Sequence, residues 1–440
     1  MTTQPRVRSV PPAPAKPQPN RFVGKTGAQI LHEMLVHDHG VEVIFGYPGG
    51  AILPVFDALY KTTAKFILNR HEQACGHAAD GYARATGKPG VCVVTSGPGA
   101  TNTVTPLATA QLDSIPIIVF SGQVATKMIG NDAFQEADVT GITRPCTKWN
   151  YLVKSLDELP RIINEAFIIA TSGRPGPVLI DLPKDITSQV CQHELDPTPR
   201  EHILRRRKTN LTGGSAKQVM EAAELINRSE RPVLYVGGGA ITSGAWQAVR
   251  MVADKGNIPC TTTLLGLGAF DEHDPKSLYM LGMHGSAFAN FAVQECDCLI
   301  AVGARFDDRV TGNLASFAPK ARIIHIDIDP TSISKTVDVD VPVVGDARLS
   351  LEALFPHIES RPRKKWFEQI AEWKKKYPFK YFDDSSAAKP QYVLEEINRQ
   401  TRGQAIYTTG VGQHQMWAAQ FLRWRFPRQM ITSGGLGTMG

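Results

Sequence analysis

Residues 91–102 read VCVVTSGPGATN, an apolar run that ends in a turn rich in glycine and proline. The same order of apolar run and glycine turn occurs at 41–50, 232–239 and 299–305. β-Branched residues favour strands, and glycine permits the tight turn that follows them. Short strands that alternate with helical stretches predict parallel βαβ units with helices on both faces of the sheet. Ligands bind such sheets at the carboxyl ends of the strands, where these turns lie.

The alternating pattern divides the chain into α/β units. We expect a disordered arm or presequence remnant at 1–21, an N-terminal domain at 22–190, a linker at 191–215, a central domain at 216–357, a linker helix at 358–390, and the start of an incomplete third domain at 391–440. The expected strands are 41–45, 66–68, 91–94, 116–120 and 177–182, then 232–236, 299–302, 322–328 and 341–344, and finally 405–408 and 430–432, with a helix at 411–421.

Composition excludes several classes of protein. Of the 440 residues, 42% are hydrophobic and 20% are charged, and no apolar run is long enough to span a bilayer. Most of the net charge of +6 comes from five basic residues in the acid-free stretch 1–32, so the basic footprint of a nucleic-acid binder is missing. The seven scattered cysteines include no Cys-x-x-Cys, which argues against a disulfide framework or a structural zinc site and favours a reducing compartment. Cys296 and Cys298 lie before an apolar run and are expected to be buried core thiols.

Glu72 follows an expected strand and lies beside His71, in a neighbourhood that is otherwise poor in charge. A carboxylate sheltered from water there suits proton exchange with a bound heterocycle. The alternative is an exposed glutamate in the first turn of a helix, where the helix dipole favours a negative charge. Position alone leaves both interpretations open.

Several motifs together resemble one family. The sequences GYPGGA at 46–51, RHEQ at 70–73 and SGPGATN at 96–102 resemble the first domain of thiamine-diphosphate enzymes. With DAFQE at 132–136, TKWN at 147–150, SGRPGP at 172–177, GARFDDRVTG at 303–312 and TGVGQHQMW at 409–417, residues 22–440 resemble the acetolactate synthase catalytic subunits.

The resemblance implies the architecture of thiamine-diphosphate enzymes, with doubly wound parallel-sheet domains, and a transferase with three cofactors. Members of this family decarboxylate pyruvate on thiamine diphosphate and transfer the hydroxyethyl unit to pyruvate or 2-ketobutyrate, the first common step toward valine, leucine and isoleucine. FAD and Mg²⁺ are the other cofactors, and flavin is mainly structural because the net reaction involves no redox change. The active site lies between two subunits, so the resemblance implies a homodimer or a dimer with a full-length homologue, and allows a regulatory subunit. It implies neither a nucleic-acid nor a membrane partner.

Matching positions assign the candidate site residues. Catalytic roles fall on Glu72, Gly49, Gly50, Gln135 and Lys184. Thiamine diphosphate contacts fall on Pro48, Glu72, Pro98, Asn102, Gln413, His414, Gly437 and Met439. FAD contacts fall on Arg174, His284, Gly303, Arg305, Asp307, Arg309, Asp327 and Asp346. The residues assigned to the substrate or inhibitor channel are Ala51, Ala125, Phe134 and Asp308.

The chain departs from the family pattern in two places. The Gly-Asp-Gly motif that ligates the metal in this family does not follow the glycine turn at 433–440, so we expect no metal ligands in this chain, Mg²⁺ ligands beyond residue 440, and a truncated third domain. Ala125 stands where the family usually has proline, in a loop where inhibitors bind, which suggests altered inhibitor sensitivity.

Two alternatives to an active acetolactate synthase stay open. One is a catalytically degenerate or resistance-type paralogue that dimerises with a full-length subunit. The other is a different FAD-retaining thiamine-diphosphate enzyme, such as a pyruvate oxidase. In a eukaryote we expect a mitochondrial location, and otherwise a cytoplasmic one.

Overall fold

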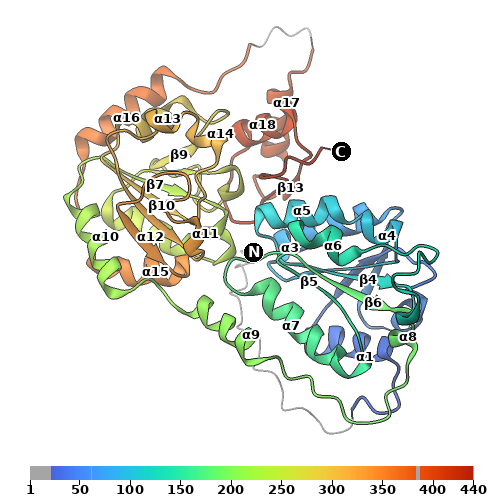
Figure 1. Ribbon diagram of the computed structural model, residues 1–440. Coiled ribbons are helices and arrows are strands. Elements are labelled where there is room, and N and C mark those ends of the chain that lie inside the picture. Colours follow the sequence, from blue (N-terminus) through green and yellow to red (C-terminus); the bar gives the residue numbers. More distant parts are fainter. Residues whose placement is uncertain (1–20, 61, 383–386, 440) are drawn as a thin grey trace.

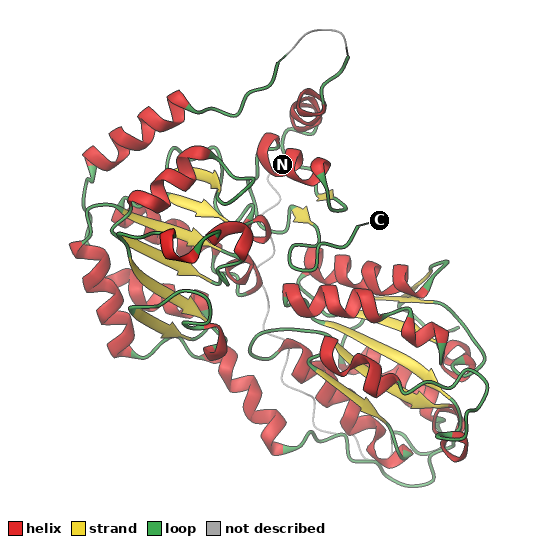
Figure 2. Ribbon diagram, turned by 45° about the horizontal axis from the view of Figure 1, so that its top comes forward, coloured by secondary structure: helices red, strands yellow, loops and turns green. Residues whose placement is uncertain are grey.

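Two parallel sheets organise the computed structural model, which describes residues 21–60, 62–382 and 387–439 (Figure 1). Helices lie on both sides of each sheet (Figure 2). This arrangement confirms the predicted α/β class, because parallel strands need crossover helices and are buried on both faces. The expected arm at 1–21 lies outside the described residues, except for Arg21, which forms an ion pair with Asp38.

The first sheet has six strands in the order β2-β1-β3-β4-β6-β5, and all neighbours are parallel. Its strands are β1 (Val43–Gly46), β2 (Lys65–Leu68), β3 (Gly90–Val94), β4 (Ile117–Gln123), β5 (Trp149–Leu152) and β6 (Val178–Pro183). Every residue of β3, β4 and β6 is buried, so the centre of the sheet is covered on both faces. Its helices are α1 (Gly27–Glu33), α2 (Leu53–Leu59), α3 (Glu72–Thr86), α4 (Pro98–Thr101), α5 (Val104–Asp113), α6 (Val139–Thr143), α7 (Leu159–Thr171) and α8 (Lys184–Ser188).

The second sheet also has six parallel strands, in the order β12-β11-β10-β7-β8-β9. They are β7 (Pro232–Val236), β8 (Cys260–Thr262), β9 (Ser277–Met280), β10 (Cys298–Val302), β11 (Arg322–Asp327) and β12 (Val341–Val344). The helices of this part are α10 (Ala216–Arg228), α11 (Gly238–Thr242), α12 (Trp246–Gly256), α13 (Ala287–Glu295), α14 (Asp308–Thr311), α15 (Ala347–Leu354) and α16 (Lys364–Lys376).

A small third segment lies between the two larger parts in both views (Figures 1 and 2). It consists of α17 (Pro390–Gln400), α18 (Gln413–Phe421) and the parallel pair β13 (Tyr407–Thr408) and β14 (Met430–Ile431). Trp424 is fully buried in a cluster that also contains Leu267 and Met280 of the central part. The third segment therefore shares its core with the central sheet.

Most expected strands are found within a few residues of their predicted limits, but the sequence missed β5, β8 and β9. The expected linker at 191–215 contains the helix α9 (Glu201–Arg206), followed by a 3₁₀ turn. All seven cysteines are buried and free, and the predicted burial of Cys296 and Cys298 is confirmed. None of the helices in the described part of the chain combines the length and the apolar composition that a membrane span requires.

Glu272 is a buried carboxyl at the contact between the central part and the third segment. Its side chain is 4% exposed, and Oε2 accepts a hydrogen bond from the Trp424 backbone N–H at 3.3 Å. Its other oxygen, Oε1, has no partner among the described residues. Burial raises the pKa of Glu272 to about 8, so the folded protein holds a proton that the unfolded chain releases near its ordinary pKa of about 4.3.

The substitution Glu272→Gln should flatten the dependence of stability on pH. The proton on Glu272 favours the folded state fully below about pH 4, and this contribution is lost as the pH rises through the folded-state pKa of about 8. The free energy of unfolding of the wild type should therefore fall, relative to Glu272→Gln, by about 1.4 kcal/mol per pH unit between roughly pH 5 and 8. Urea unfolding at several pH values measures this difference.

The exposed Glu359 provides the matched control. Glu359→Gln should leave the pH profile of the wild type unchanged. Parallel profiles for the wild type and Glu272→Gln would show that the buried carboxyl does not control stability in this range.

Candidate functional site

The carboxyl edge of the first sheet gathers the candidate residues of the first domain. Turns after β1, β2, β3, β4 and β6 all leave this edge, because parallel strands end on the same side. The structure thus brings together Pro48, Gly49, Gly50, Ala51, Glu72, Pro98, Asn102, Ala125, Phe134, Gln135 and Lys184. The sequence placed the turns at 46–50 and 96–102 and Glu72 at strand ends, and assigned the remaining residues from the resemblance; their common edge follows from the strand order.

Glu72 is the first residue of α3, and its exposed fraction is 9%. The His71 side chain caps this helix by accepting a hydrogen bond from the Gln73 backbone N–H. Oε2 of Glu72 accepts a hydrogen bond from Nδ2 of Asn102 at 3.0 Å. The carboxylate is therefore sheltered and held by a neutral amide, and the helix N-terminus adds a favourable dipole.

Glycine backbone borders this carboxylate. A Cβ atom at position 99 would lie 3.3 Å from Oε1 of Glu72 and 2.6 Å from Cγ2 of Thr95. A Cβ atom at position 49 would lie 2.5 Å from Cβ of Thr95. The buried Thr95 hydroxyl has no partner among the described residues. Glycine at 49 and 99 therefore lets both turns pack directly on Thr95, and the Thr95 hydroxyl is a buried polar group left over for a ligand.

A buried polar network holds the loops that carry the channel candidates. Nε2 of Gln123 donates hydrogen bonds to Oδ2 of Asp181 at 2.9 Å and to the carbonyl oxygen of Ala137 at 3.0 Å. Oε1 of Gln123 accepts from the Val124 backbone N–H at 2.8 Å, and Ser121 Oγ donates to Asp181 Oδ1 at 2.7 Å. Burial raises the pKa of Asp181 to about 7. The Gln123 side chain therefore joins the start of this loop region, at 124, to its end, at 137.

The channel candidates lie on these loops and on the neighbouring helix α8. Thr126, next to Ala125, donates its backbone N–H to Oδ1 of Asp185 at 3.0 Å, which connects that loop to the turn that carries Lys184. Phe134 is 89% exposed. Gln135 has a left-handed backbone, with φ of 59°, and a Cβ atom at Gly97 would lie 2.6 Å from its carbonyl oxygen.

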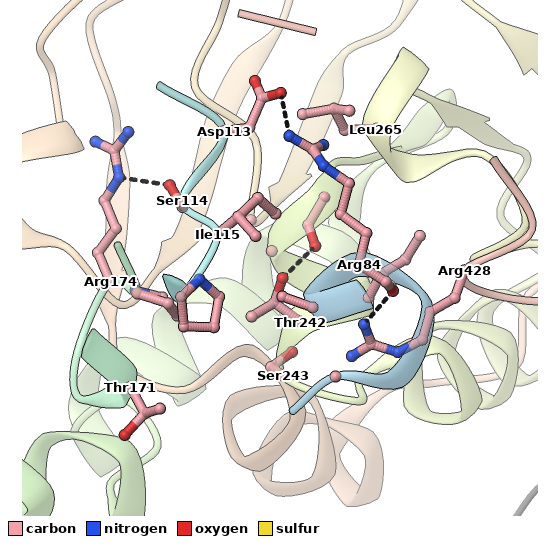
Figure 3. Close-up of a pocket in the computed structure, with 18 of the residues that line it drawn as sticks. Arg84, Asp113, Ser114, Ile115, Thr171, Arg174, Thr242, Ser243, Leu265 and Arg428 are labelled. Atoms are coloured by element: carbon pink, nitrogen blue, oxygen red, sulfur yellow. Dashed lines mark hydrogen bonds and ion pairs between the residues drawn. The ribbon is translucent and has the colours of Figure 1, made fainter. Parts of the chain in front are cut away.

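A cleft of about 2750 Å³ lies where the first domain, the central domain and the third segment meet (Figure 3). All eight residues assigned to FAD line it: Arg174, His284, Gly303, Arg305, Asp307, Arg309, Asp327 and Asp346. Arg174 comes from the first domain, where its Nε donates to Ser114 Oγ at 2.7 Å, and its guanidinium lies 3.6 Å from the Asp329 carboxylate of the central domain. The cleft volume exceeds the range of about 300–1,000 Å³ that is typical of small-ligand pockets, so it can hold an extended ligand.

Close backbone contact shapes the central wall of this cleft. A Cβ atom at Gly237 would lie 2.2 Å from the carbonyl oxygen of Gly303, and one at Gly239 would lie 2.7 Å from Cα of Gly303. The hydroxyl of Tyr235, which also lines the cleft, is buried and has no partner among the described residues. Asp307 and Asp346 cap the helices α14 and α15, and burial raises the pKa of Asp346.

Four further candidates lie in the third segment, and the structure does not bury them against Glu72. Gln413 and His414 are exposed in the first turn of α18, and Met439 is 76% exposed. Gly437 lines the interdomain cleft. Asp308, assigned to the channel, also lines that cleft rather than the edge that carries Ala125 and Phe134.

Thr95, Asp113, Gln123 and Asp181 are residues of these sites that the motifs did not single out. Asp113 and Asp181 are lone acids at the end of an apolar helix and within an apolar strand, which is the one sequence signal that marks them. Within the described residues, no group of three or more His, Cys, Asp or Glu side chains is placed to hold a metal ion.

In a comparison with known protein families, each of the three parts of the chain matches a domain of the thiamine pyrophosphate enzymes. Residues 25–142 match the family described as thiamine pyrophosphate enzyme, N-terminal TPP binding domain. Residues 219–354 match its central domain, and residues 410–440 match its C-terminal TPP binding domain.

Curated relatives agree with the resemblance drawn from the motifs. The mitochondrial acetolactate synthase catalytic subunit of Saccharomyces cerevisiae is 53% identical over 95% of this chain and 64% of its own length. The acetolactate synthase large subunit of Parasynechococcus marenigrum is 52% identical over 94% of this chain and 68% of its own length. The isozyme 3 large subunit of Escherichia coli is 47% identical over 94% and 73%, respectively. The chain thus spans 64% of the length of the first of these relatives.

Replacing Gln123 by leucine should destabilise the first domain. Leucine has a similar size, but it leaves the Asp181 carboxyl, the Ala137 carbonyl and the Val124 N–H without the partner that Gln123 provides. Because buried polar groups without partners cost about 1–3 kcal/mol each, we expect the free energy of unfolding to fall by roughly 2–4 kcal/mol. Denaturant unfolding measures this loss.

Lys127→Ala serves as the control in the same loop, because the Lys127 side chain is exposed. It should change the free energy of unfolding by no more than about 0.5 kcal/mol. Equal stabilities of Gln123→Leu and Lys127→Ala would contradict a holding role for the buried amide.

Proposed function

The chain belongs to the acetolactate synthase catalytic subunits, a family of thiamine-diphosphate enzymes, and on this premise we propose that it forms acetolactate from pyruvate. Pyruvate would be decarboxylated, and the hydroxyethyl unit would be transferred to a second 2-ketoacid, either pyruvate or 2-ketobutyrate. This reaction is the first common step of valine, leucine and isoleucine biosynthesis.

One observation carries the proposal. The Glu72 carboxylate, 9% exposed, lies at the carboxyl edge of a parallel sheet, beside glycine backbone and within hydrogen-bonding distance of Asn102. A sheltered carboxylate at such an edge can hold a proton against a ring nitrogen of a bound aminopyrimidine. Pro48 and Pro98, the other first-domain positions assigned to thiamine diphosphate, lie on the turns of the same edge.

Thiamine diphosphate, when bound, supplies the carbon nucleophile and the electron sink for the loss of carbon dioxide from pyruvate. The role that we propose for Glu72 is to hold the proton at the aminopyrimidine ring. Gly49 and Gly50 would let the backbone approach the reacting carbon. Gln135 and the exposed ammonium of Lys184 would face the incoming ketoacid, whose carboxylate a positive charge attracts. Ala51, Ala125 and Phe134 would border its path.

FAD would occupy the interdomain cleft. Direct packing of Gly237 and Gly239 on Gly303 shapes the wall of this cleft, and the unpaired Tyr235 hydroxyl offers a hydrogen bond there. Arg174, Arg305 and Arg309 suit the diphosphate, and the carboxylates of Asp307, Asp327 and Asp346 suit the hydroxyl groups. His284 lines the same space. The flavin would have a structural role, since the net reaction transfers no electrons to it.

A second subunit would complete the site at Glu72. Leu53, Leu68 and Phe134 around this edge are 52%, 62% and 89% exposed, and exposed apolar side chains that gather on one surface are typical of interaction sites. Gln413, His414 and Met439, also exposed, would reach the cofactor across a dimer interface, together with Gly437. We propose a homodimer or a dimer with a longer homologue as the active assembly.

Mg²⁺ is the third cofactor that the family implies. The described residues gather no cluster of acidic or histidine side chains that could hold it, so no role in a step is assigned to the metal ion. The fungal relatives are named mitochondrial, and several others are named large subunits. On this basis we propose a mitochondrial location if the source is a eukaryote, and a regulatory subunit as a further partner.

The substitution Glu72→Gln should abolish acetolactate formation without removing the flavin. Glutamine keeps the size of the side chain and the bond to Asn102 but loses the proton-accepting carboxylate, so the rate should fall by a factor of about 10²–10⁴. Acetolactate released from pyruvate, with thiamine diphosphate, Mg²⁺ and FAD added, measures the rate. Flavin fluorescence of the same sample measures retention of FAD.

Glu42→Gln is the matched control, because that glutamate is exposed and pairs with Lys88. It should keep the wild-type rate. Acetyl phosphate or hydrogen peroxide as the product would favour a pyruvate oxidase. If the wild type binds no thiamine diphosphate even with Mg²⁺ present, the non-catalytic paralogue that acts through a full-length subunit becomes the better interpretation.

A further inference from the structure

The turn at Gly434-Gly435 lies where all three parts of the protein meet. Both glycines line the interdomain cleft, together with Leu112 and Asp113 of the first domain and Leu265 of the central domain. Figure 3 shows Asp113 and Leu265 close together at this junction, with the Arg84 guanidinium directed at Asp113 and Arg428 next to Arg84. Neither the motifs nor the family matches assign a role to Asp113.

The side chain of Asp113 binds the backbone N–H groups of this turn. Its side chain is fully buried, Oδ2 accepts from the Gly434 N–H at 3.0 Å, and Oδ1 accepts from the Gly435 N–H at 2.7 Å. Two successive backbone N–H groups that converge on one anion form a favourable site for negative charge. Oδ2 also accepts from Nη2 of Arg84 at 2.8 Å. One carboxylate therefore satisfies three donors, two of which belong to the third segment.

Both glycines are packed too closely for a side chain. A Cβ atom at Gly434 would lie 2.8 Å from Cγ of Leu265. A Cβ atom at Gly435 would lie 2.9 Å from Cβ of Leu112, 3.0 Å from Oδ1 of Asp113 and 3.2 Å from Nη2 of Arg305. The turn is thus in contact with the first domain on one side and with the central domain on the other, and Arg305 is a residue of the cleft wall.

Arg84 also connects the first domain to the third segment at this junction. Its guanidinium binds Asp80, one helical turn away on α3, as well as Asp113 on α5. Its backbone carbonyl accepts a hydrogen bond from Nη1 of Arg428, in the third segment, at 2.7 Å. Asp80 contacts Arg84 but lines no part of the cleft, and this difference separates the two acids experimentally.

We propose that Asp113 is a positioning residue that holds the Gly434-Gly435 turn against the cleft and thereby determines how tightly the cleft retains a flavin dinucleotide. The ligand class rests on the proposed function, whereas the contact itself does not. With the turn held, the wall formed by Gly434, Gly435 and Arg305 is complete before the ligand arrives. A preformed wall favours binding, because no ordering of the turn opposes it.

An amide cannot replace this carboxylate. An asparagine side chain at this position would offer a single acceptor oxygen to the three donors, and its NH₂ group would face either a glycine N–H or the Arg84 guanidinium. Asp113→Asn should therefore release at least one end of the turn while keeping the size of the side chain. We expect the dissociation constant for FAD to rise by about tenfold or more, which corresponds to ~1.4 kcal/mol.

Asp80→Asn is the matched control. It removes the other carboxylate partner of Arg84 on the same pair of helices but leaves both contacts to the turn. The FAD-free thermal midpoint should fall in both variants, whereas FAD affinity should fall only in Asp113→Asn. Quenching of flavin fluorescence, with FAD titrated into the full chain, measures the affinity.

A second variant tests the same contact from the other end. Gly435→Ala removes no charge and no donor, but its methyl group would crowd Asp113 and Leu112, so it should also weaken FAD binding. Because both substitutions disturb one contact, the double variant should lose less affinity than the sum of the two single losses. If Asp113→Asn does not fold, Gly435→Ala alone tests the contact.

The outcomes separate this inference from the proposed function. A wild type that binds no FAD overturns the ligand assignment and this inference with it. Wild-type FAD affinity in both Asp113→Asn and Gly435→Ala overturns the inference alone, and so does an equal loss of affinity in Asp80→Asn. Selective loss in Asp113→Asn and Gly435→Ala supports it.

Discussion

The close approach of bare backbone segments is the constraint on which both ligand regions depend. At the first sheet, Gly49 and Gly99 meet Thr95 so closely that a Cβ atom would collide. At the second sheet, Gly237 and Gly303 meet in the same way. Parallel strands deliver their turns to one edge, and glycine lets two such turns touch. Glycine at these positions therefore lets the turns pack directly against each other beside Glu72 and along the cleft.

Buried polar groups set the positions of the loops around these spaces. Glu72 is bonded to Asn102 at the end of α4, and Gln123 is bonded to Asp181 of β6 and to Ala137, so each side chain links two separate segments of the first domain. Glu272 differs, because one of its oxygens has no partner among the described residues and burial raises the pKa of this carboxyl to about 8. A neutral carboxyl costs less to bury than a charged one. The contact between the central domain and the third segment therefore favours the protonated form.

The sequence predicted those features whose causes are local. The apolar runs before glycine turns located most strands, whereas the low charge around Glu72 left a buried and an exposed glutamate equally open until the motifs were combined. β5 was missed because its residues are only half-buried and show no apolar run, and β8 was missed because it has three residues. The motif-based FAD assignment named eight residues that line one cleft, one of which, Arg174, belongs to the first domain. Asp113 could not be found, since its partner Gly434 lies 321 positions away.

The charges around Arg84 explain why the third segment is held at this point. Two carboxylates, Asp80 and Asp113, bind a single guanidinium, so these three side chains together carry a formal charge of −1. Burial raises the pKa of Asp80, as expected for an acid that is imperfectly compensated. Removing a negative charge from water is favourable only where donors replace the lost hydration. The N–H groups of Gly434 and Gly435 supply two such donors to Asp113. The buried Asp113 carboxylate is stabilised by the two glycine N–H groups, and those N–H groups in turn find their acceptor there. This directional contact makes attachment of the third segment more specific than apolar packing alone.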